Sequence, residues 1–292
     1  MAPSPKKTTV LRRLLKQEET LLAPGCFNAL SARLVEQAGF KAIYISGAAV
    51  AGNFLGYPDI GLTTMSEVLE NARNIVRVTN LPVICDADTG FGNAINMNRT
   101  VREFEEAGLA GIQIEDQVMP KKCGHTEGKL LISKAEMVQK VKAAVDARQD
   151  TDFVLVVRTD AIAVNGLEDA LDRGLAYQEA GADIIFVEAP RTLEEMHRVC
   201  RTIKAPLLAN MVEGGGKTPI LPLQELQEMG YKLVIYPVSA HMAAIKAMQA
   251  LLAILKRDGT TGAYASQMAS FPEMFEVVGR SHFTALESKY AS

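Results

Sequence analysis

The chain has 292 residues, 48% of them hydrophobic and 22% charged, and 31 basic against 34 acidic residues give a net charge of −3. This composition excludes intrinsic disorder and argues against a basic nucleic-acid-binding surface or a polybasic membrane patch. No apolar run approaches the ~18 residues of a membrane span, and the charged first segment lacks a signal core. The four cysteines are too scattered for a zinc or disulfide framework. We therefore expect a cytoplasmic protein that binds a small molecule, with no nucleic acid and no membrane as partner.

Short apolar runs recur along the chain, and each ends in polar residues. They occupy positions 20–23, 42–46, 82–86, 111–115, 153–158, 184–188, 206–210 and 233–236. Continuous apolar runs of this length are typical of strands buried on both faces, as in a parallel sheet. Helical spacing of apolar residues between them is clearest at 66–79, 98–107, 134–147 and 168–180. Ala-Gly or Met-Gly pairs, which are typical helix ends, precede four of the runs.

Strands and helices are thus predicted to alternate. Eight strand–helix units of about 36 residues each predict a (β/α)8 TIM barrel, an α/β fold that typically takes about 250 residues. The surplus lies at the ends, where we expect an N-terminal helix at about 9–19 and a helical tail at about 258–292. A doubly wound open sheet is the alternative, but no Gly-x-Gly-x-x-Gly follows the first strand. Because no linker or change in composition divides the chain, we predict one domain over 1–292.

In a barrel the active site forms where the parallel strands end. The residues that stand there are Ser46, Gly47, Ala48, Asp86, Asp88, Glu115, Asp116, Arg158, Asp160, Glu188 and Asn210. Any one of them could be a helix cap or a surface charge, but several carboxylates at one mouth repel each other and call for a cation. An oxygen-only donor set favours Mg²⁺ or Mn²⁺. We expect Asp86 and Asp88 to be ligands, with Asp59 and Glu115 acting through waters.

The loop after the fourth predicted strand carries a cysteine in basic surroundings. Its residues are Lys121, Lys122, Cys123, Gly124 and His125. Neighbouring cations lower the pKa of a thiol, so Cys123 is a candidate acid, base or nucleophile on a mobile loop. The alternative is an ordinary exposed cysteine. The other three cysteines suit buried positions, where cysteine behaves as a small apolar residue.

Three motifs carry a resemblance to a known family. They are Asp-Ala-Asp-Thr-Gly-Phe-Gly at 86–92, Ile-Glu-Asp-Gln at 114–117 and Lys-Lys-Cys-Gly-His at 121–125. Together they resemble the isocitrate lyase/phosphoenolpyruvate mutase superfamily, and the match runs from about 24 to 236. The last motif is typical of the carbon–carbon lyase branch, in which its cysteine is the catalytic acid. The resemblance implies a (β/α)8 barrel whose last helix is exchanged between the subunits of a dimer, usually within a homotetramer.

The resemblance also implies what the matching residues do. Asp86 and Asp88 would bind Mg²⁺, for which Mn²⁺ can substitute, and Asp59 and Glu115 would support the ion through waters. Cys123 would protonate the carbanion that remains after retro-aldol cleavage of a 2-hydroxy diacid. The reaction also needs a base for the 2-hydroxyl proton, and that base is not determined.

The substrate would be held on several sides. The implied binding residues are Ser46, Gly47, Ala48, Cys123, Gly124, His125, Arg158, Glu188 and Asn210. The first three would bind the carboxylate of the pyruvate-like half, Arg158 would neutralise the developing oxyanion, and the last two would contact the other half. The loop residues would close over the site. Tyr44 and a metal-bound hydroxide are both candidates for the base.

One departure from the family pattern bears on the substrate. Met242 stands where a methylisocitrate lyase carries the arginine for its third carboxylate, and a thioether cannot replace a guanidinium fork. The segment 210–219 resembles the group of petal death protein, 2,3-dimethylmalate lyase and phosphonomutase. We therefore expect a substituted malate, such as 2,3-dimethylmalate, as substrate. The alternatives are 2-methylisocitrate lyase and carboxyphosphonoenolpyruvate phosphonomutase, with a Schiff-base aldolase and a non-catalytic binding protein as more distant ones.

Overall fold

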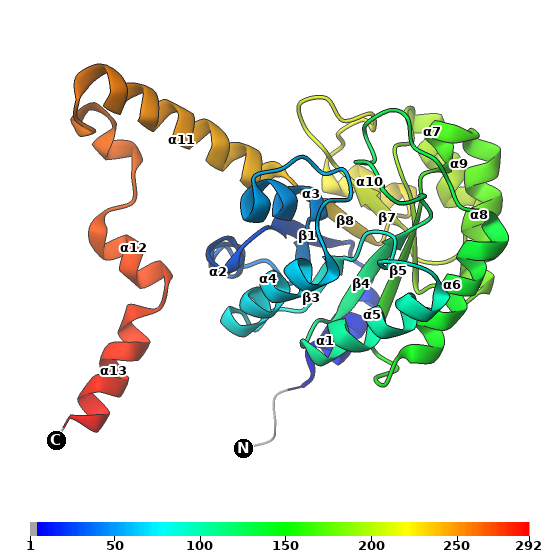
Figure 1. Cartoon of the computed structure of the whole chain (residues 1–292), viewed down its shortest axis with the longest axis horizontal. Coiled ribbons are helices and arrows are strands. Elements are labelled where there is room, and N and C mark those ends of the chain that lie inside the picture. The colour runs from blue at the N-terminus through cyan, green and yellow to red at the C-terminus, as the bar shows by residue number, and fades with distance from the viewer. Residues whose placement is uncertain (1–4, 292) are drawn as a thin grey trace.

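Eight parallel strands stand at the centre of the molecule, with helices around them (Figure 1). The computed structural model describes residues 5–291, and residues 1–4 and 292 of the expected domain lie outside the described residues. The strands are β1 (Leu21–Cys26), β2 (Ile43–Ile45), β3 (Val83–Asp86), β4 (Gly111–Glu115), β5 (Val154–Thr159), β6 (Ile184–Val187), β7 (Leu208–Asn210) and β8 (Leu233–Tyr236). Each coincides with one of the apolar runs of the sequence.

The sheet closes on itself. Its order is β6-β5-β4-β3-β2-β1-β8-β7, so the first strand pairs with both the second and the eighth. A parallel bridge between Ile185 and Leu207 joins β6 to the segment that enters β7, and Ile185 N–H donates to Pro206 O at 2.9 Å. The predicted (β/α)8 barrel is therefore confirmed, and the doubly wound alternative is wrong.

The strand side chains alternate between two cores. Ile84 and Val156 belong to the cluster inside the barrel, whereas Cys85 and Val157, one position further on, pack toward the helices. Alternation is the rule for any strand, but here both faces are buried, so the sequence shows unbroken apolar runs. Leu11 of α1 (Lys7–Leu15) joins the inner cluster and is fully buried. The N-terminal helix therefore closes the amino ends of the strands.

The helices around the barrel are α2 (Ala29–Gln37), α3 (Gly47–Val50), the π-helical η1 (Ala51–Leu55), α4 (Met65–Val78), α5 (Ala94–Glu106), α6 (Lys134–Ala147), α7 (Ala161–Val164), α8 (Leu167–Glu179), α9 (Leu193–Thr202) and α10 (Leu223–Met229). The four predicted helices correspond to α4, α5, α6 and α8. Thr64 and Glu67 form a reciprocal capping box at the start of α4. Helix α5 begins four residues before the predicted position because the Asn93 side chain caps it there.

Two expected boundaries near the N-terminus are wrong. The helix placed at about 9–19 is α1, which begins at Lys7 and ends at Leu15. Beyond it, the ammonium group of Lys232 binds the carbonyl groups of Gln17 and Glu19. The first strand was expected to stop at 23, before a proline. It continues to Cys26 because the last two residues pair with β2.

The C-terminal residues form an arm that leaves the barrel (Figure 1). It consists of α11 (Ser239–Asp258), the 3₁₀ turn η2 (Gly262–Gln267), α12 (Phe271–Val277) and α13 (Arg280–Tyr290). The expected helical tail is thus present, and α11 brings it away from the strands. None of the side chains of α11, α12 or α13 is buried, and the exposed apolar ones include Met248, Leu252, Phe271, Met274, Phe283 and Tyr290. Over residues 5–291 no helix is both long enough and apolar enough to span a membrane.

Candidate active site

A cavity of about 60 Å³ lies among the carboxyl ends of the strands. Its walls include Tyr44, Ser46, Ala48, Asp59, Asp86, Cys123, Gly124, His125, Arg158, Glu188 and Asn210. The remaining three residues of the predicted set, Gly47, Asp88 and Glu115, lie directly behind these walls. The fold thus gathers the whole predicted set. A cavity of this size holds only a few waters, so the loop that carries Cys123 is closed.

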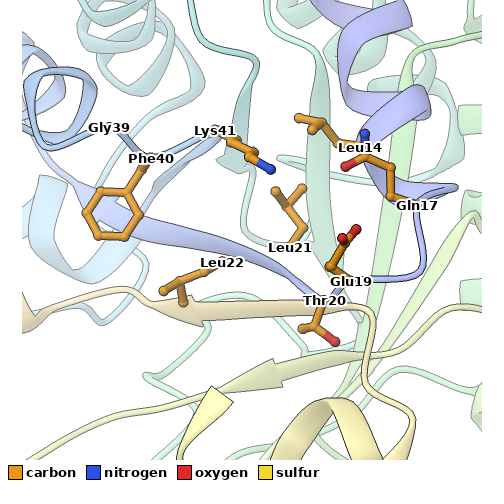
Figure 2. A pocket seen from close by; sticks show the side chains of 9 residues that line it. All are labelled: Leu14, Gln17, Glu19, Thr20, Leu21, Leu22, Gly39, Phe40 and Lys41. Carbon is orange, nitrogen blue, oxygen red and sulfur yellow. The ribbon is translucent and has the colours of Figure 1, made fainter. Parts of the chain in front are cut away.

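A larger hollow of about 210 Å³ lies at the opposite end of the barrel (Figure 2). It is lined by Leu14, Gln17, Glu19, Thr20, Leu21, Leu22, Gly39, Phe40 and Lys41, which come from the end of α1 and the starts of the first two strands. Its charged side chains are one acid and one base. Barrel enzymes carry their chemistry at the carboxyl ends of the strands, so the smaller cavity is the candidate active site.

Three buried carboxylates crowd the ends of β3 and β4. Asp86, Asp88 and Glu115 are 8%, 3% and 1% exposed. Burial, together with the charge of Asp88, raises the pKa of Asp86 to about 6. Burial also raises the pKa of Asp88, and it raises that of Glu115 well above the ordinary value. Asp88 adopts a left-handed φ of 48° and donates its N–H to Asp86 Oδ1 at 3.1 Å, a strained backbone of the kind found at functional sites.

The charge around the cavity fits a bound cation. Six acidic side chains face three basic ones: Asp59, Asp86, Asp88, Glu115, Asp160 and Glu188 against Lys121, Lys129 and Arg158. Neither carboxylate oxygen of Glu115 accepts a hydrogen bond from residues 5–291. In that same range no three His, Cys, Asp or Glu side chains converge to hold a metal alone. Mg²⁺ is typically bound in proteins through one or two carboxylates and keeps several waters.

Lys121 is a site residue that the sequence analysis missed. The sequence places it in the loop and gives it no role, but its side chain is buried and only 2% exposed. Its ammonium group lies 2.7 Å from Asp88 Oδ1 and also contacts Asp59. The surplus of acids at the strand ends signals that a cation is needed nearby. The sequence could not show which of the two adjacent lysines turns inward, because only the path of the folded loop decides it.

Ser46, Gly47 and Ala48 form the turn from β2 into α3. Ser46 Oγ accepts the N–H of Ala49 at 3.4 Å and so caps the helix. The N–H groups of the first turn have no carbonyl partner within a helix and are available to an anionic group. A Cβ on Gly47 would lie 2.8 Å from Asp86 Oδ2. Only glycine therefore lets this turn approach the carboxylates so closely.

Arg158, at the end of β5, is held in a fork. Its Nε and Nη2 donate to Asp160 Oδ2 and Oδ1, both at 3.0 Å, and its Nη1 lies 3.1 Å from Glu188 Oε2. Burial alone would raise the pKa of Asp160, but Arg158 outweighs it and lowers that pKa. The N–H of Asp160 donates in turn to Asp116 Oδ1 at 3.0 Å. These two aspartates, to which the sequence analysis gave no role, fix the arginine in the cavity.

Cys123 lies on the closed loop, and its N–H donates to Asp59 O at 3.2 Å. Burial raises the pKa of the thiol, whereas we predicted that the neighbouring lysines would lower it. That prediction is wrong because Lys121 is paired with Asp59 and Asp88, so loss of solvent outweighs the cations. The thiol therefore stays protonated at neutral pH, as a general acid requires.

Gly124 and His125 complete the closed loop. A Cβ on Gly124 would collide with the guanidinium of Arg158 and lie 2.6 Å from Glu188 Oε2, so glycine is required there. His125 Nδ1 accepts the N–H of Lys217 at 3.1 Å, and its Nε2 lies 3.4 Å from Glu188 Oε1. Burial lowers the pKa of His125. The ring is thus neutral at pH 7, with its proton on the nitrogen that faces Glu188.

Tyr44 and Asn210 stand on opposite parts of the wall. The Tyr44 hydroxyl donates to Gln113 Oε1 at 2.8 Å, and burial raises the pKa of Tyr44 well above its ordinary value. In this arrangement the phenol is a donor, and the geometry does not support the suggestion that it takes a substrate proton. Asn210 Nδ2 lies 3.3 Å from Glu188 Oε2, while its Oδ1 is buried without a hydrogen-bond partner among residues 5–291.

The arrangement of these residues agrees with a known family. A family profile described as phosphoenolpyruvate phosphomutase matches residues 11–256. The chain belongs to this family. It is 49% identical over 282 residues to a 2,3-dimethylmalate lyase from Eubacterium barkeri, which covers 97% of each chain. It is also 49% identical over 277 residues to a 2-methylisocitrate lyase from Aeropyrum pernix, covering 95% of this chain and 89% of that one.

Solved structures of the phosphoenolpyruvate mutase/isocitrate lyase superfamily share the fold over almost the whole length. A crystal structure of a 2,3-dimethylmalate lyase has a TM-score of 0.94 and 36% identity, and covers 99% of this chain and 97% of that one. A phosphonopyruvate hydrolase in complex with oxalate and Mg²⁺ has a TM-score of 0.89 and 33% identity, and covers 99% and 100%. The chain is therefore an enzyme of this superfamily, and the lyases among its relatives support a carbon–carbon lyase.

Proposed function

We propose that this enzyme is a Mg²⁺-dependent lyase that cleaves a substituted malate by retro-aldol chemistry, with 2,3-dimethylmalate, giving pyruvate and propionate, as the favoured substrate. The observation that carries the proposal is the position of Cys123, whose loop closes over a cavity lined by buried carboxylates and Arg158. Cleavage of a carbon–carbon bond leaves a carbanion that must receive a proton. A half-buried thiol on a closing loop meets that need, and the loop keeps solvent away until the bond has broken.

The reaction breaks the bond between C2 and C3 of the malate. Loss of the 2-hydroxyl proton lets C2 become the ketone of the 2-oxo acid, and the electron pair stays on C3 beside its carboxylate. Asp86 and Asp88 would hold Mg²⁺, or Mn²⁺ in its place, with Asp59 and Glu115 acting through waters. The ion supplies Lewis acidity that eases loss of the hydroxyl proton. The magnesium in the related phosphonopyruvate hydrolase supports this assignment.

The side chains of this enzyme do the remaining work. Arg158 and the N–H groups of Gly47 and Ala48 bind the carboxylate and the developing negative charge, a contribution that often amounts to several kcal/mol. Glu188 and Asn210 contact the other half of the substrate, for which Asn210 has an unpaired oxygen ready among the described residues. Cys123 then gives its proton to C3, where the electron pair left by the broken C2–C3 bond forms the new C–H bond.

Met242 favours a malate with a small substituent over a tricarboxylate. It stands where the family resemblance places the arginine for a third carboxylate, and a thioether cannot form a two-pronged ion pair. Identity alone does not decide between substrates, since one lyase of each kind is 49% identical. 2-Methylisocitrate, cleaved to pyruvate and succinate, is therefore the second candidate. A carboxyphosphonoenolpyruvate phosphonomutase is the third, because an Arabidopsis relative carries the name carboxyvinyl-carboxyphosphonate phosphorylmutase.

Release of 2-oxo acid from a panel of substrates tests the proposal. We expect the purified enzyme with Mg²⁺ to have its highest kcat/KM for 2,3-dimethylmalate among that compound, 2-methylisocitrate, isocitrate and oxaloacetate. EDTA should abolish activity, and Mg²⁺ or Mn²⁺ should restore it. Met242→Arg should improve kcat/KM for 2-methylisocitrate relative to dimethylmalate. If the wild type prefers 2-methylisocitrate by about tenfold, the proposed substrate is wrong and the second candidate replaces it. Full activity without metal would refute the role of the ion.

We also propose that the arm mediates assembly into a homotetramer, as a dimer of dimers that exchange their last helix. Its support is the set of exposed apolar side chains on α11, α12 and α13. These three helices bury none of their side chains in the isolated chain. Apolar surface of this extent is typical of a protein interface. A reducing compartment such as the cytoplasm suits the four cysteines, which are all free.

A further inference from the structure

Lys129 is a buried cation that the reaction outlined above does not use. It lies on the same loop as Cys123 and is 5% exposed. Its ammonium group donates to the carbonyl oxygens of Gly124 and, at 3.0 Å, of Thr126. The same group lies 3.6 Å from Asp160 Oδ1. A lysine is almost never buried this completely unless its charge is paired, and here the partners belong to two different parts of the site.

One of those partners also holds the arginine of the site. Asp160 Oδ1, which faces Lys129, accepts the Nη2 of Arg158 at 3.0 Å. The other partner, Gly124, lies so close to Arg158 and Glu188 that a Cβ would collide with the guanidinium. Lys129 therefore joins the closed loop to the carboxylate that orients Arg158. The loop thus contacts Arg158 directly at Gly124, and indirectly through the ammonium group of Lys129 and the carboxylate of Asp160.

We infer that Lys129 is a positioning residue that holds the loop closed and couples closure to the orientation of Arg158. The inference rests on the proposed function, since it assigns the loop and Arg158 to one reaction. The carbonyl oxygens of Gly124 and Thr126 lie on the loop itself, so loop closure brings Lys129 to the carboxylate of Asp160, and opening would leave Asp160 with less positive charge. A buried hydrogen bond to a charged group is strong, and leaving its partners unpaired is costly.

A neighbouring lysine provides the matched control. Lys122 lies on the same loop, is exposed, and its side chain takes part in no ion pair or hydrogen bond among residues 5–291. Lys129→Met and Lys122→Met thus remove the same charge from the same loop. A general effect of loop charge would appear in both variants, whereas the inference confines the effect to Lys129.

Alkylation of Cys123 by iodoacetamide reports closure without any substrate. The rate is measured on the full-length protein by mass spectrometry of the labelled peptides, and half-buried Cys200 on α9 serves as an internal control. We expect Lys129→Met to raise the rate at Cys123 by about tenfold, because loss of a charged hydrogen bond shifts the opening equilibrium by about that much. The rate at Cys200 and both rates in Lys122→Met should stay at the wild-type value.

Equal Cys123 rates in Lys129→Met and the wild type would overturn the inference, and so would equal increases at Cys123 and Cys200, which indicate general loosening. If Lys129→Met fails to fold, Lys129→Gln, which keeps a donor but loses the charge, replaces it with the same criteria. In the active enzyme a positioning role predicts a fall in kcat larger than the change in KM. A wild type inactive on every malate would refute the proposed function while the alkylation result still decided the role of Lys129.

Discussion

At the scale of single residues, the thiol of Cys123 shows how burial reverses an expectation from sequence. Two adjacent lysines favour a thiolate, yet one of them turns inward to Asp59 and Asp88. The thiol then loses solvent without gaining a free positive charge, and its pKa rises. The same sequence motif therefore holds a protonated thiol, whereas its basic composition favours a thiolate.

Cys123→Ser tests this acid. The hydroxyl group keeps nearly the size and hydrogen bonding of the thiol but gives up its proton far less readily. We expect kcat to fall by about 10²- to 10⁴-fold with little change in KM, the usual contribution of general acid catalysis. Steady-state release of 2-oxo acid measures both constants, and Cys200→Ser is the control. A fully active Cys123→Ser enzyme would show that the cysteine only lines the loop.

At the scale of elements, the ends of β3 and β4 concentrate charge that the metal-free protein cannot neutralise. Asp86 and Asp88 follow one apolar strand and Glu115 ends the next, so the parallel sheet itself brings the three carboxylates together. Their raised pKa values show that ionisation is unfavourable there. Ionisation of these three carboxylates therefore lowers the stability of the folded barrel, and a bound divalent cation would remove this penalty.

That cost predicts an unusual pH dependence. The pKa of Asp86 is about 6 in the folded protein and 3.8 in its ordinary state, so the folded state binds the proton more tightly. Its contribution to stability is present below the ordinary pKa and is lost as the pH rises through 6. With EDTA present, we expect the Tm of Asp86→Asn to exceed that of the wild type by a few degrees at pH 7, and the difference to shrink toward pH 4.

Differential scanning calorimetry across this pH range provides the measurement. Addition of Mg²⁺ at pH 7 should raise the Tm of the wild type, since the ion binds the folded state alone, and should leave Asp86→Asn almost unchanged. A wild type with a higher Tm than Asp86→Asn in EDTA at pH 7 would contradict the raised pKa of this buried carboxylate.

At the scale of the whole molecule, the barrel buries apolar side chains, whereas the arm exposes them to solvent. The barrel has two continuous cores, whereas α12 and α13 bury none of their side chains. Helices of this length are marginal by themselves in water. The proposed assembly would give the arm a partner surface on a second copy of the chain and so cover its exposed apolar residues.

Deletion of residues 260–292 tests the role of the arm. We expect light scattering to show a homotetramer for the full chain and a smaller species for the truncated one, because the interface loses its apolar side chains. Far-ultraviolet circular dichroism should still show a folded barrel, since its cores lie outside the deleted segment. As a milder control, Phe271→Ser with Phe283→Ser should weaken assembly without shortening the chain. A full-length monomer would refute the assembly proposal.

The sequence by itself determined the barrel and most of the site. Strands buried on both faces appear as unbroken apolar runs, and parallel connections carry all their carboxyl ends to one mouth. The polar residues that stop those runs, such as Asp86, Arg158 and Asn210, could therefore be assigned to one site before any coordinates were known. Helix caps were harder to predict from the sequence, because a cap depends on one local side chain. Helix α5 begins earlier than predicted because the side chain of Asn93 caps it.

Only the tertiary structure decided which charges are paired. Lys121 and Lys129 look like ordinary loop lysines in the sequence, yet both are buried against aspartates from other elements. The proton states of Cys123 and Tyr44 likewise follow from burial, which neither residue's neighbours in the chain reveal. Strand periodicity is a short-range property that the sequence displays directly. Desolvation and ion pairing depend on distances between segments far apart in the chain, so they exist only once the loop has closed over the barrel.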